Sequence, residues 1–337
     1  MTHTEQVIEV SGLRRRYGPS GEAGYEAVRG IDLNVGRGEL FALLGTNGAG
    51  KTSTVELLEG LEKPTAGEIR VLGHDPYRER SRVRPRTGTM LQEGGFPSEL
   101  TVAETARMWA GLTSRARPTD EVLELVGLSH RRDVRVKLLS GGERRRLDLG
   151  LAVMGRPEVL FLDEPTTGMD AEGRADTWKL VRELKEQGTT VLLTTHYLEE
   201  AERLADQLAI MHKGRIVAAG TPAEVVANQP ARIRFTLPAH VAPARLPLTL
   251  PVAVEGRRAE VRTQHLQQSL TILLGWASDE GVELADLDAR SASLEEAFLS
   301  LARQGDELRF EGGGANGDAA DNDGMAWAAG PQDGVRA

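Results

Sequence analysis

A glycine-rich segment that joins an apolar run to a helical pattern constrains this chain more than any other feature. Residues 40–44 are apolar and of strand length, and residues 52–61 carry apolar side chains at helical spacing. Between them, the sequence GTNGAGKT (45–52) fits the pattern G-x-x-x-x-G-K-[ST]. Strand, glycine-rich turn and helix in this order predict an α/β fold with this turn at a strand end.

The chemistry of such a turn is anion binding. Glycines let successive backbone N–H groups point inward, and the helix start at Lys51 adds unpaired N–H groups and a positive dipole end. Lys51 is expected to reach the β- and γ-phosphates of a nucleotide, and the Thr52 hydroxyl to hold Mg²⁺. The other expected cradle residues are Gly45, Asn47, Gly48, Ala49, Gly50 and Ser53. A glycine-rich turn that binds nothing is the alternative, and the flanking strand and helix argue against it.

Composition narrows the class of protein. The chain has 337 residues, enough for about two domains, and no cysteine, which excludes disulfides, thiolate zinc sites and iron–sulfur clusters. No apolar run approaches the ~18 residues of a membrane span, and the N-terminus lacks the regions of a secretory signal, so a cytoplasmic location is expected. The net charge of −9 argues against nucleic acid as the main partner.

The patterns along the chain predict a domain organisation. Residues 1–229 alternate between strands and helices, which predicts a largely parallel sheet with covered faces and a mostly helical insert at about 94–156. Residues 230–310, with strand patterns followed by helices at 265–281 and 293–303, predict a small α+β domain. Residues 311–337 are mostly Gly, Ala, Asp and Asn, and so predict a disordered acidic tail.

Two adjacent carboxylates end the apolar strand pattern VLFLDEP (159–165). Burying a charge is costly without a partner of opposite charge. Beside the strand that leads into the phosphate-binding turn 45–52 (the P-loop), that partner is Mg²⁺ bound to the phosphates. Asp163 is therefore expected to hold the ion through water. Glu164 is expected to face the γ-phosphate and to polarise the attacking water as general base. A pair of exposed loop acids is the alternative.

The segment KLLSGGERRR (137–146) contains a second helix start suited to phosphate. Ser140 and Glu143 have the spacing of a capping box, and Gly141 and Gly142 leave N–H groups open to a close ligand. A chain that binds one nucleotide does not need two helix starts that bind phosphate. If they belong to different chains, the helix start of one protomer closes on the nucleotide held by the P-loop of the other. The alternative is an ordinary capped helix.

The motifs GTNGAGKT, LSGGE, VLFLDEP and TTH, in this order over residues 5–225, resemble the ATP-binding subunits of ABC transporters. The resemblance implies a P-loop NTPase fold of the ABC type, α/β with a mixed sheet core, a helical subdomain insert and here a small C-terminal α+β domain. It implies ATP and Mg²⁺ as cofactors. It also implies a head-to-tail homodimer with two ATP molecules between P-loop and LSGGE.

The resemblance assigns further roles residue by residue. Gln92 in MLQEG is similar to the glutamine that senses Mg²⁺ and the γ-phosphate, Asp170 in TTGMD to the aspartate that contacts the partner protomer, and His196 to the histidine that contacts the γ-phosphate. Tyr17 in RRYG is similar to the aromatic that stacks on adenine, with Tyr25 as a rival because a polar loop separates the two.

Two positions depart from the family pattern. Glu143 stands where glutamine is more frequent and Met169 where leucine is, and neither departure removes a catalytic group. Both nucleotide sites of a homodimer are therefore expected to be competent.

Within the superfamily, the stretches around these motifs resemble the daunorubicin-resistance type of exporter subunit, which works with a separate integral-membrane permease. The resemblance implies an ATPase at the cytoplasmic face of the cell membrane that powers export of a drug or other small hydrophobic compound. The alternative is a soluble mechanical ATPase of the same superfamily, acting on ribosomes or DNA. A single ATP-binding core and the lack of a strongly basic extension argue against it, and a small-molecule kinase does not explain LSGGE.

Overall fold

The computed structural model describes residues 5–18, 24–92, 95, 97–227, 229–247 and 251–301. The body of the molecule is built on a six-stranded sheet in the order β5-β6-β7-β3-β8-β9, parallel except for the β8–β9 pair. Its strands are β3 (Leu40–Gly45), β5 (Thr87–Met90), β6 (Val159–Asp163), β7 (Thr190–Thr195), β8 (Gln207–His212) and β9 (Arg215–Gly220). All residues of β3, β6 and β7 are buried, which is why β3 and β6 read as nearly continuous apolar runs.

A second sheet covers one face of the first. It is antiparallel, in the order β2-β1-β4, and consists of β1 (Gln6–Tyr17), β2 (Tyr25–Gly36) and β4 (Ala66–Val71). Helix α1 (Lys51–Leu58) contributes Val55, Leu57 and Leu58 to the apolar core that joins the two sheets. The glycine-rich turn is therefore fixed from both sides, by β3 and by a buried helix.

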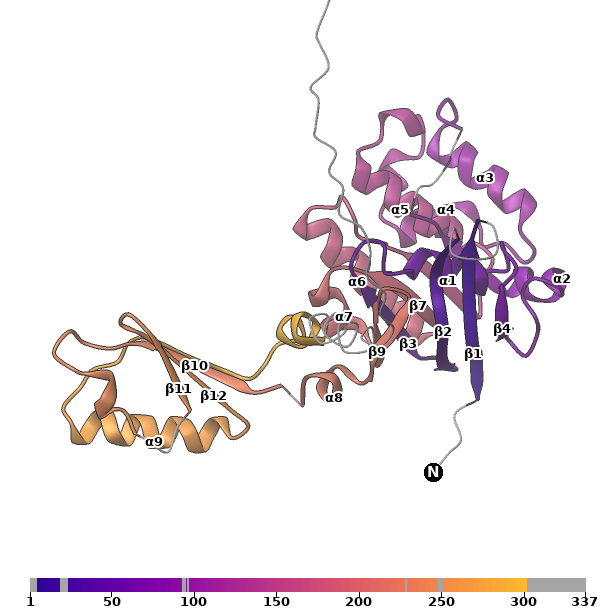
Figure 1. Ribbon diagram of the computed structural model, residues 1–337. Helices are drawn as coiled ribbons and strands as arrows, with labels where there is room; N and C mark the ends of the chain where they lie inside the picture. Colours follow the sequence, from indigo (N-terminus) through magenta and orange to yellow (C-terminus); the bar gives the residue numbers. More distant parts are fainter. Residues whose placement is uncertain are drawn as a thin grey trace, which may run out of the picture.

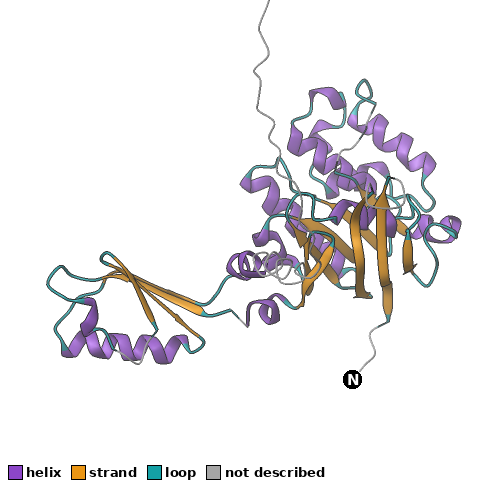
Figure 2. Cartoon of the chain, in the orientation of Figure 1, coloured by secondary structure: helices purple, strands orange, loops and turns teal. Residues whose placement is uncertain are grey.

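Helices cover the opposite face of the large sheet (Figure 2). They include the predicted helical insert, α3 (Val102–Leu112), α4 (Thr119–Leu125) and α5 (Gly141–Ala152), together with α6 (Ala171–Glu186) and α7 (Leu198–Leu204). The short helices α2 (Arg80–Val83) and α8 (Pro222–Ala227) lie at the periphery. Capping boxes form at Thr101 and at Ser140, and the one at Ser140 is predicted from the sequence. No helix among the described residues has both the length and the apolar character needed to cross a membrane.

A separate lobe follows the body and extends away from it (Figure 1). It is an antiparallel sheet in the order β11-β12-β10-β13 with α9 along one face and an apolar core of its own. The elements are β10 (Ala231–Thr236), β11 (Val252–Glu255), β12 (Arg258–Thr263), α9 (Leu266–Asp279) and β13 (Ala285–Arg290). Strand β13 was not predicted, because this mostly exposed edge strand has a polar sequence without an apolar alternation.

The helix after β13 was predicted to belong to this lobe, and the structure places it elsewhere. Residues 294–301 are helical, and Leu294 and Ala297 are fully buried in the core of the body. The backbone N–H of Leu294 donates to Glu202 of α7 at 3.0 Å. Helical periodicity predicts that a helix has an apolar face, but it does not say which core will receive that face. The predicted tail at 311–337 lies outside the described residues.

Candidate active site

The glycine-rich turn has the backbone that an anion cradle needs. Helix α1 starts at Lys51, and its N-cap Gly50 has φ +106° and offers no capping side chain. A Cβ at Gly50 would lie 2.3 Å from the carbonyl oxygen of Ala27, and one at Gly45 would lie 2.6 Å from that of Met211. Glycine is thus required for space as well as for conformation, and the first N–H groups of α1 remain available to a ligand.

A cavity of about 330 Å³ opens over this turn. Residues from β1, β2, the turn, α1 and two later segments line it: Tyr17, Tyr25, Ala27, Asn47, Gly48, Gly50, Lys51, Thr52, Ser53, Gln92 and Glu164. The fold therefore brings Gln92 and Glu164 to the P-loop from distant parts of the sequence. Two other predicted residues support the turn from behind, since Gly45 accepts a hydrogen bond from Lys51 and Ala49 accepts one from Gly214.

Both candidate tyrosines stand at the mouth of this cavity. The hydroxyl of Tyr17 lies 3.1 Å from Ser53 Oγ, and that of Tyr25 donates to the carbonyl of Gly48 at 3.4 Å. The guanidinium of Arg15 lies 4.7 Å from the centre of the Tyr17 ring. Tyr17 is 38% exposed and Tyr25 is 56% exposed, so either ring is accessible to a flat base.

Charged side chains converge at the inner end of the cavity. Glu164 Oε1 lies 3.6 Å from Lys51 Nζ and 3.1 Å from His196 Nδ1, and Thr167 Oγ1 donates to Glu164 Oε2 at 3.2 Å. Burial raises the pKa of Glu164, but the hydrogen bond and charge of His196 and the charge of Lys51 outweigh burial and hold this pKa below its ordinary value. Glu164 is therefore ionised at neutral pH and able to accept a proton from water.

The neighbouring strand β7 holds the Asp163 carboxylate and the backbone of Glu164 at the end of β6. Thr194 pairs with Asp163 in the parallel ladder, and its hydroxyl donates to Asp163 Oδ1. The N–H of Glu164 donates to the carbonyl of Thr194 at 3.1 Å, while Glu164 itself has φ +50°, which is uncommon for a residue with a Cβ. Thr194 and Thr167 are not among the site residues predicted from the sequence. The available signal for Thr194 is its place in TTH, because parallel strands end at the same edge.

Oxygen ligands suited to Mg²⁺ gather around the cavity. Thr52 and Gln92 line it with a hydroxyl and an amide, and the Asp163 carboxylate precedes Glu164. No group of three or more His, Asp or Glu side chains in the described part of the chain can by itself form a metal cage. One carboxylate with neutral oxygens fits an ion that keeps several waters and binds mainly through phosphate oxygens.

The second predicted helix start is formed, but it lies outside this cavity. Ser140 Oγ accepts from the N–H of Glu143 at 3.2 Å, and Glu143 Oε2 accepts from the N–H of Ser140 at 2.8 Å. No residue of the segment 140–142 lines the cavity, and neither does Asp170, whose exposed carboxylate caps α6.

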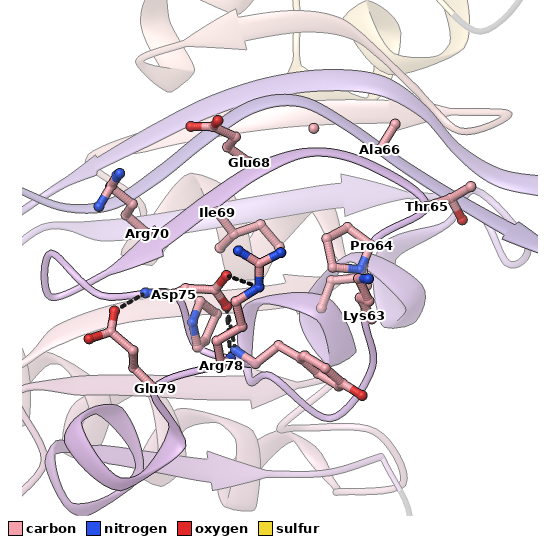
Figure 3. Close-up of a pocket in the computed structure, with 14 residues that line it drawn as sticks. Lys63, Pro64, Thr65, Ala66, Glu68, Ile69, Arg70, Asp75, Arg78 and Glu79 are labelled. Atoms are coloured by element: carbon pink, nitrogen blue, oxygen red, sulfur yellow. Dashed lines mark hydrogen bonds and ion pairs between the residues drawn. The ribbon is translucent and has the colours of Figure 1, made fainter.

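A larger groove, of about 570 Å³, runs along β4 and the loop that follows it (Figure 3). Two of its acids have local hydrogen-bond partners, since Asp75 accepts from the N–H groups of Tyr77 and Arg78 at 2.9 Å and 3.0 Å, and Glu79 accepts from the N–H of Asp75 at 3.1 Å. None of the predicted site residues lines this groove. The chemistry of the smaller cavity, rather than size, therefore identifies the candidate site.

Comparison with known families gives two matches. The family described as ABC transporter matches residues 28–167, and the C-terminal domain family of ABC transporter domain-containing-like proteins matches residues 231–293. The first range contains the P-loop, LSGGE and both carboxylates of β6, and the second falls within the separate lobe.

Individual relatives cover most of the chain. It is 40% identical over 319 residues to the daunorubicin resistance ATP-binding protein DrrA3 of Streptomyces coeruleorubidus, with 91% of this chain and 98% of the relative covered. It is 37% identical to the daunorubicin/doxorubicin resistance ATP-binding protein DrrA of Streptomyces peucetius, with coverage of 89% and 93%. It is 39% identical to the Nod factor export ATP-binding protein I of Ralstonia nicotianae, with coverage of 66% and 70%.

Two solved structures resemble the body. An ATP-binding subunit of an ABC transporter is 28% identical with a TM-score of 0.57, covering 65% of this chain and 91% of that one. A dimeric ATP-binding cassette in a post-hydrolysis state, bound to ADP and phosphate, is 22% identical with a TM-score of 0.59, covering 64% and 98%. The second likeness concerns the fold alone.

Proposed function

This chain belongs to the ATP-binding subunits of ABC transporters, and we propose that it powers the export of a drug or another small hydrophobic compound through a separate membrane permease. The chain is an ATPase. The nature of the cargo is inferred from relatives whose names state daunorubicin resistance or Nod factor export. None of the relatives reported above is a mechanical ATPase of ribosomes or DNA.

The observation that carries the proposal is the meeting of an anion cradle and an ionised base in one cavity. The N–H groups at the start of α1 and the ammonium of Lys51 bind the β- and γ-phosphates. Lys51 Nζ lies 3.6 Å from Glu164 Oε1, so phosphate oxygens compete with this carboxylate for the same cation. Once the phosphates take the lysine, Glu164 is free to orient water and take its proton.

The remaining site residues orient these groups. His196 Nδ1 lies 3.1 Å from Glu164 Oε1, and because the side chain of His196 is exposed, we infer that it contacts the γ-phosphate. Thr52, Gln92 and Asp163 would hold Mg²⁺, which when bound neutralises charge on the phosphates. Thr194 keeps the Asp163 carboxylate in place through its hydroxyl. The tyrosines at the mouth of the cavity provide a surface for adenine.

We further propose that the active form is a homodimer with two ATP molecules. The N–H groups at Gly141 and Gly142 stand at an exposed helix start and lie outside the cavity of their own chain. Asp170 is also exposed, so it can contact a second protomer while it caps α6. Binding to the permease would place the chain at the cytoplasmic face of the cell membrane.

The test combines hydrolysis with partner identification. The purified parent chain is expected to hydrolyse ATP, and Lys51→Ala to abolish turnover, because the cation nearest the phosphates is lost. Affinity purification of the tagged chain from detergent-solubilised membranes is expected to retain a hydrophobic integral-membrane protein. Undiminished hydrolysis by Lys51→Ala would refute the P-loop assignment. An active chain that is retained by ribosomes instead of a membrane protein would refute the export proposal.

A further inference from the structure

A single arginine joins the LSGGE helix to the strand ends that carry the catalytic carboxylates. Arg145 lies in the second turn of α5, and its side chain is 12% exposed. Its guanidinium donates to the carbonyl oxygens of Leu91 at 2.7 Å, Asp163 at 3.0 Å and Glu164 at 2.6 Å. Asp148, one turn further along α5, balances the charge at 3.5 Å.

These three carbonyls belong to residues at the strand ends that carry the site. Leu91 follows β5 and precedes Gln92, and Asp163 and Glu164 end β6. The carbonyls of Asp163 and Glu164 belong to buried residues, and such groups need a hydrogen-bond donor, which the sheet no longer supplies beyond the end of a strand. A planar guanidinium with several N–H groups serves several carbonyls at once, which an ammonium group does less well.

The contact with Glu164 has a further consequence because of its backbone conformation. A residue with a Cβ at φ +50° persists only when its surroundings fix it. The N–H of Glu164 is held by the carbonyl of Thr194 at 3.1 Å, and its carbonyl oxygen is held by Arg145 at 2.6 Å. The two bonds act on opposite sides of the Cα atom, so together they set the direction in which the carboxylate leaves the backbone.

We propose that Arg145 is a positioning residue for ATP hydrolysis, which fixes the backbone of the base Glu164 and ties it to the helix that begins at LSGGE. The inference rests on the proposed dimer, in which the start of α5 closes on the nucleotide of the partner. A displacement of α5 when the dimer closes is transmitted through Arg145 to Glu164 of the same protomer. Each protomer thus couples the nucleotide held by its partner to hydrolysis of its own.

The helical insert offers a matched control for this role. Arg117 is buried to the same degree, with 13% of its side chain exposed. Its guanidinium also contacts both a backbone carbonyl and a carboxylate. It donates to the carbonyl of Val153 at 3.3 Å and pairs with Glu121 at 2.7 Å, both within the insert. Arg117→Met therefore removes an equally buried guanidinium without touching the ends of β5 and β6.

The experiment measures ATP hydrolysis against ATP concentration for the full chain and for Arg145→Met, Arg145→Lys and Arg117→Met. Arg145→Met is expected to lower kcat by about 10- to 100-fold, as a displaced catalytic group does, and to bring the Hill coefficient close to 1. Binding of a fluorescent ATP analogue is expected to stay within about threefold of the parent, since the P-loop is intact. Arg145→Lys is expected to be intermediate, and Arg117→Met to keep the kcat and Hill coefficient of the parent even where its melting temperature falls.

Two outcomes would overturn the inference. One is parental kcat and Hill coefficient in Arg145→Lys and in any Arg145→Met that folds. The other is a loss of kcat in Arg117→Met equal to that in Arg145→Met, which would mean that the insert as a whole is damaged. Absence of hydrolysis in the parent chain would instead refute the proposed function, so the two failures are distinguishable.

Discussion

Glu164→Gln separates the binding of ATP from its hydrolysis. The substitution keeps the shape of the side chain and removes the proton acceptor that lies 3.6 Å from Lys51 and 3.1 Å from His196. ATP is expected to bind through Lys51, Thr52 and the backbone cradle, while hydrolysis falls by about 10²-fold or more, as is usual when a positioned base is lost.

The same substitution is expected to favour the ATP-bound dimer. The Coulomb attraction between this carboxylate and Lys51, 3.6 Å apart, is about 4–5 kcal/mol at an effective dielectric constant of ~20. The carboxylate repels a γ-phosphate at a similar distance by a comparable energy. Removing its charge relieves that repulsion and frees Lys51 for the phosphates. At ~1.4 kcal/mol per tenfold, the upper limit is roughly a 10³-fold gain in the stability of the closed state.

Phosphate release and size-exclusion chromatography test both parts. Glu164→Gln is expected to be inactive, monomeric without nucleotide and dimeric with ATP. Glu158→Gln is the control, because it removes a carboxylate next to the other end of β6, where Glu158 pairs with Arg86 on the surface. Hydrolysis at the parent rate would show that Glu164 is not the base. An inactive variant that never dimerises with ATP would contradict the composite site built from residues 140–142.

Three further predictions concern the surroundings of the site. Burial and the nearby charge of Asp163 raise the pKa of Glu59 from 4.5 to about 8, so the folded state binds this proton more tightly than the unfolded state and stability falls as pH rises through that range. Glu59→Gln removes this loss of stability. In urea unfolding, the free energy of unfolding of the variant is expected to rise relative to that of the parent by ~1.4 kcal/mol per pH unit over this range. Parallel pH profiles of the two proteins would contradict this reasoning. Thr194→Val frees the Asp163 carboxylate and is expected to raise the Mg²⁺ concentration for half-maximal hydrolysis by about tenfold in a magnesium titration, and an unchanged midpoint would speak against that role. Tyr17→Ala is expected to weaken the binding of ATP by about tenfold or more and to leave the binding of inorganic tripolyphosphate unchanged. A larger effect in Tyr25→Ala would assign the adenine contact to Tyr25.

Much of the site is encoded locally and could be predicted from the sequence. The P-loop needs glycine at particular positions and a helix that starts at Lys51, and both are properties of adjacent residues. The capping box at Ser140 depends on a spacing of three residues, which fixes its hydrogen bonds once the helix forms. The carboxylates of Asp163 and Glu164 at the end of a fully buried strand were predictable for the same reason.

The sequence alone thus determines the two helix starts, the carboxylates and the apolar strands of the body, because each depends on neighbouring residues and on periodicity. Only the tertiary structure decides which groups meet: Thr194 beside Asp163, Arg145 on three backbone carbonyls, and the helix at 294–301 on the body instead of the lobe. Backbone carbonyls carry no signature in the sequence, and an apolar face fits any apolar core of suitable shape. Contacts of these kinds depend on how distant elements pack, and packing is settled only when the whole chain has folded.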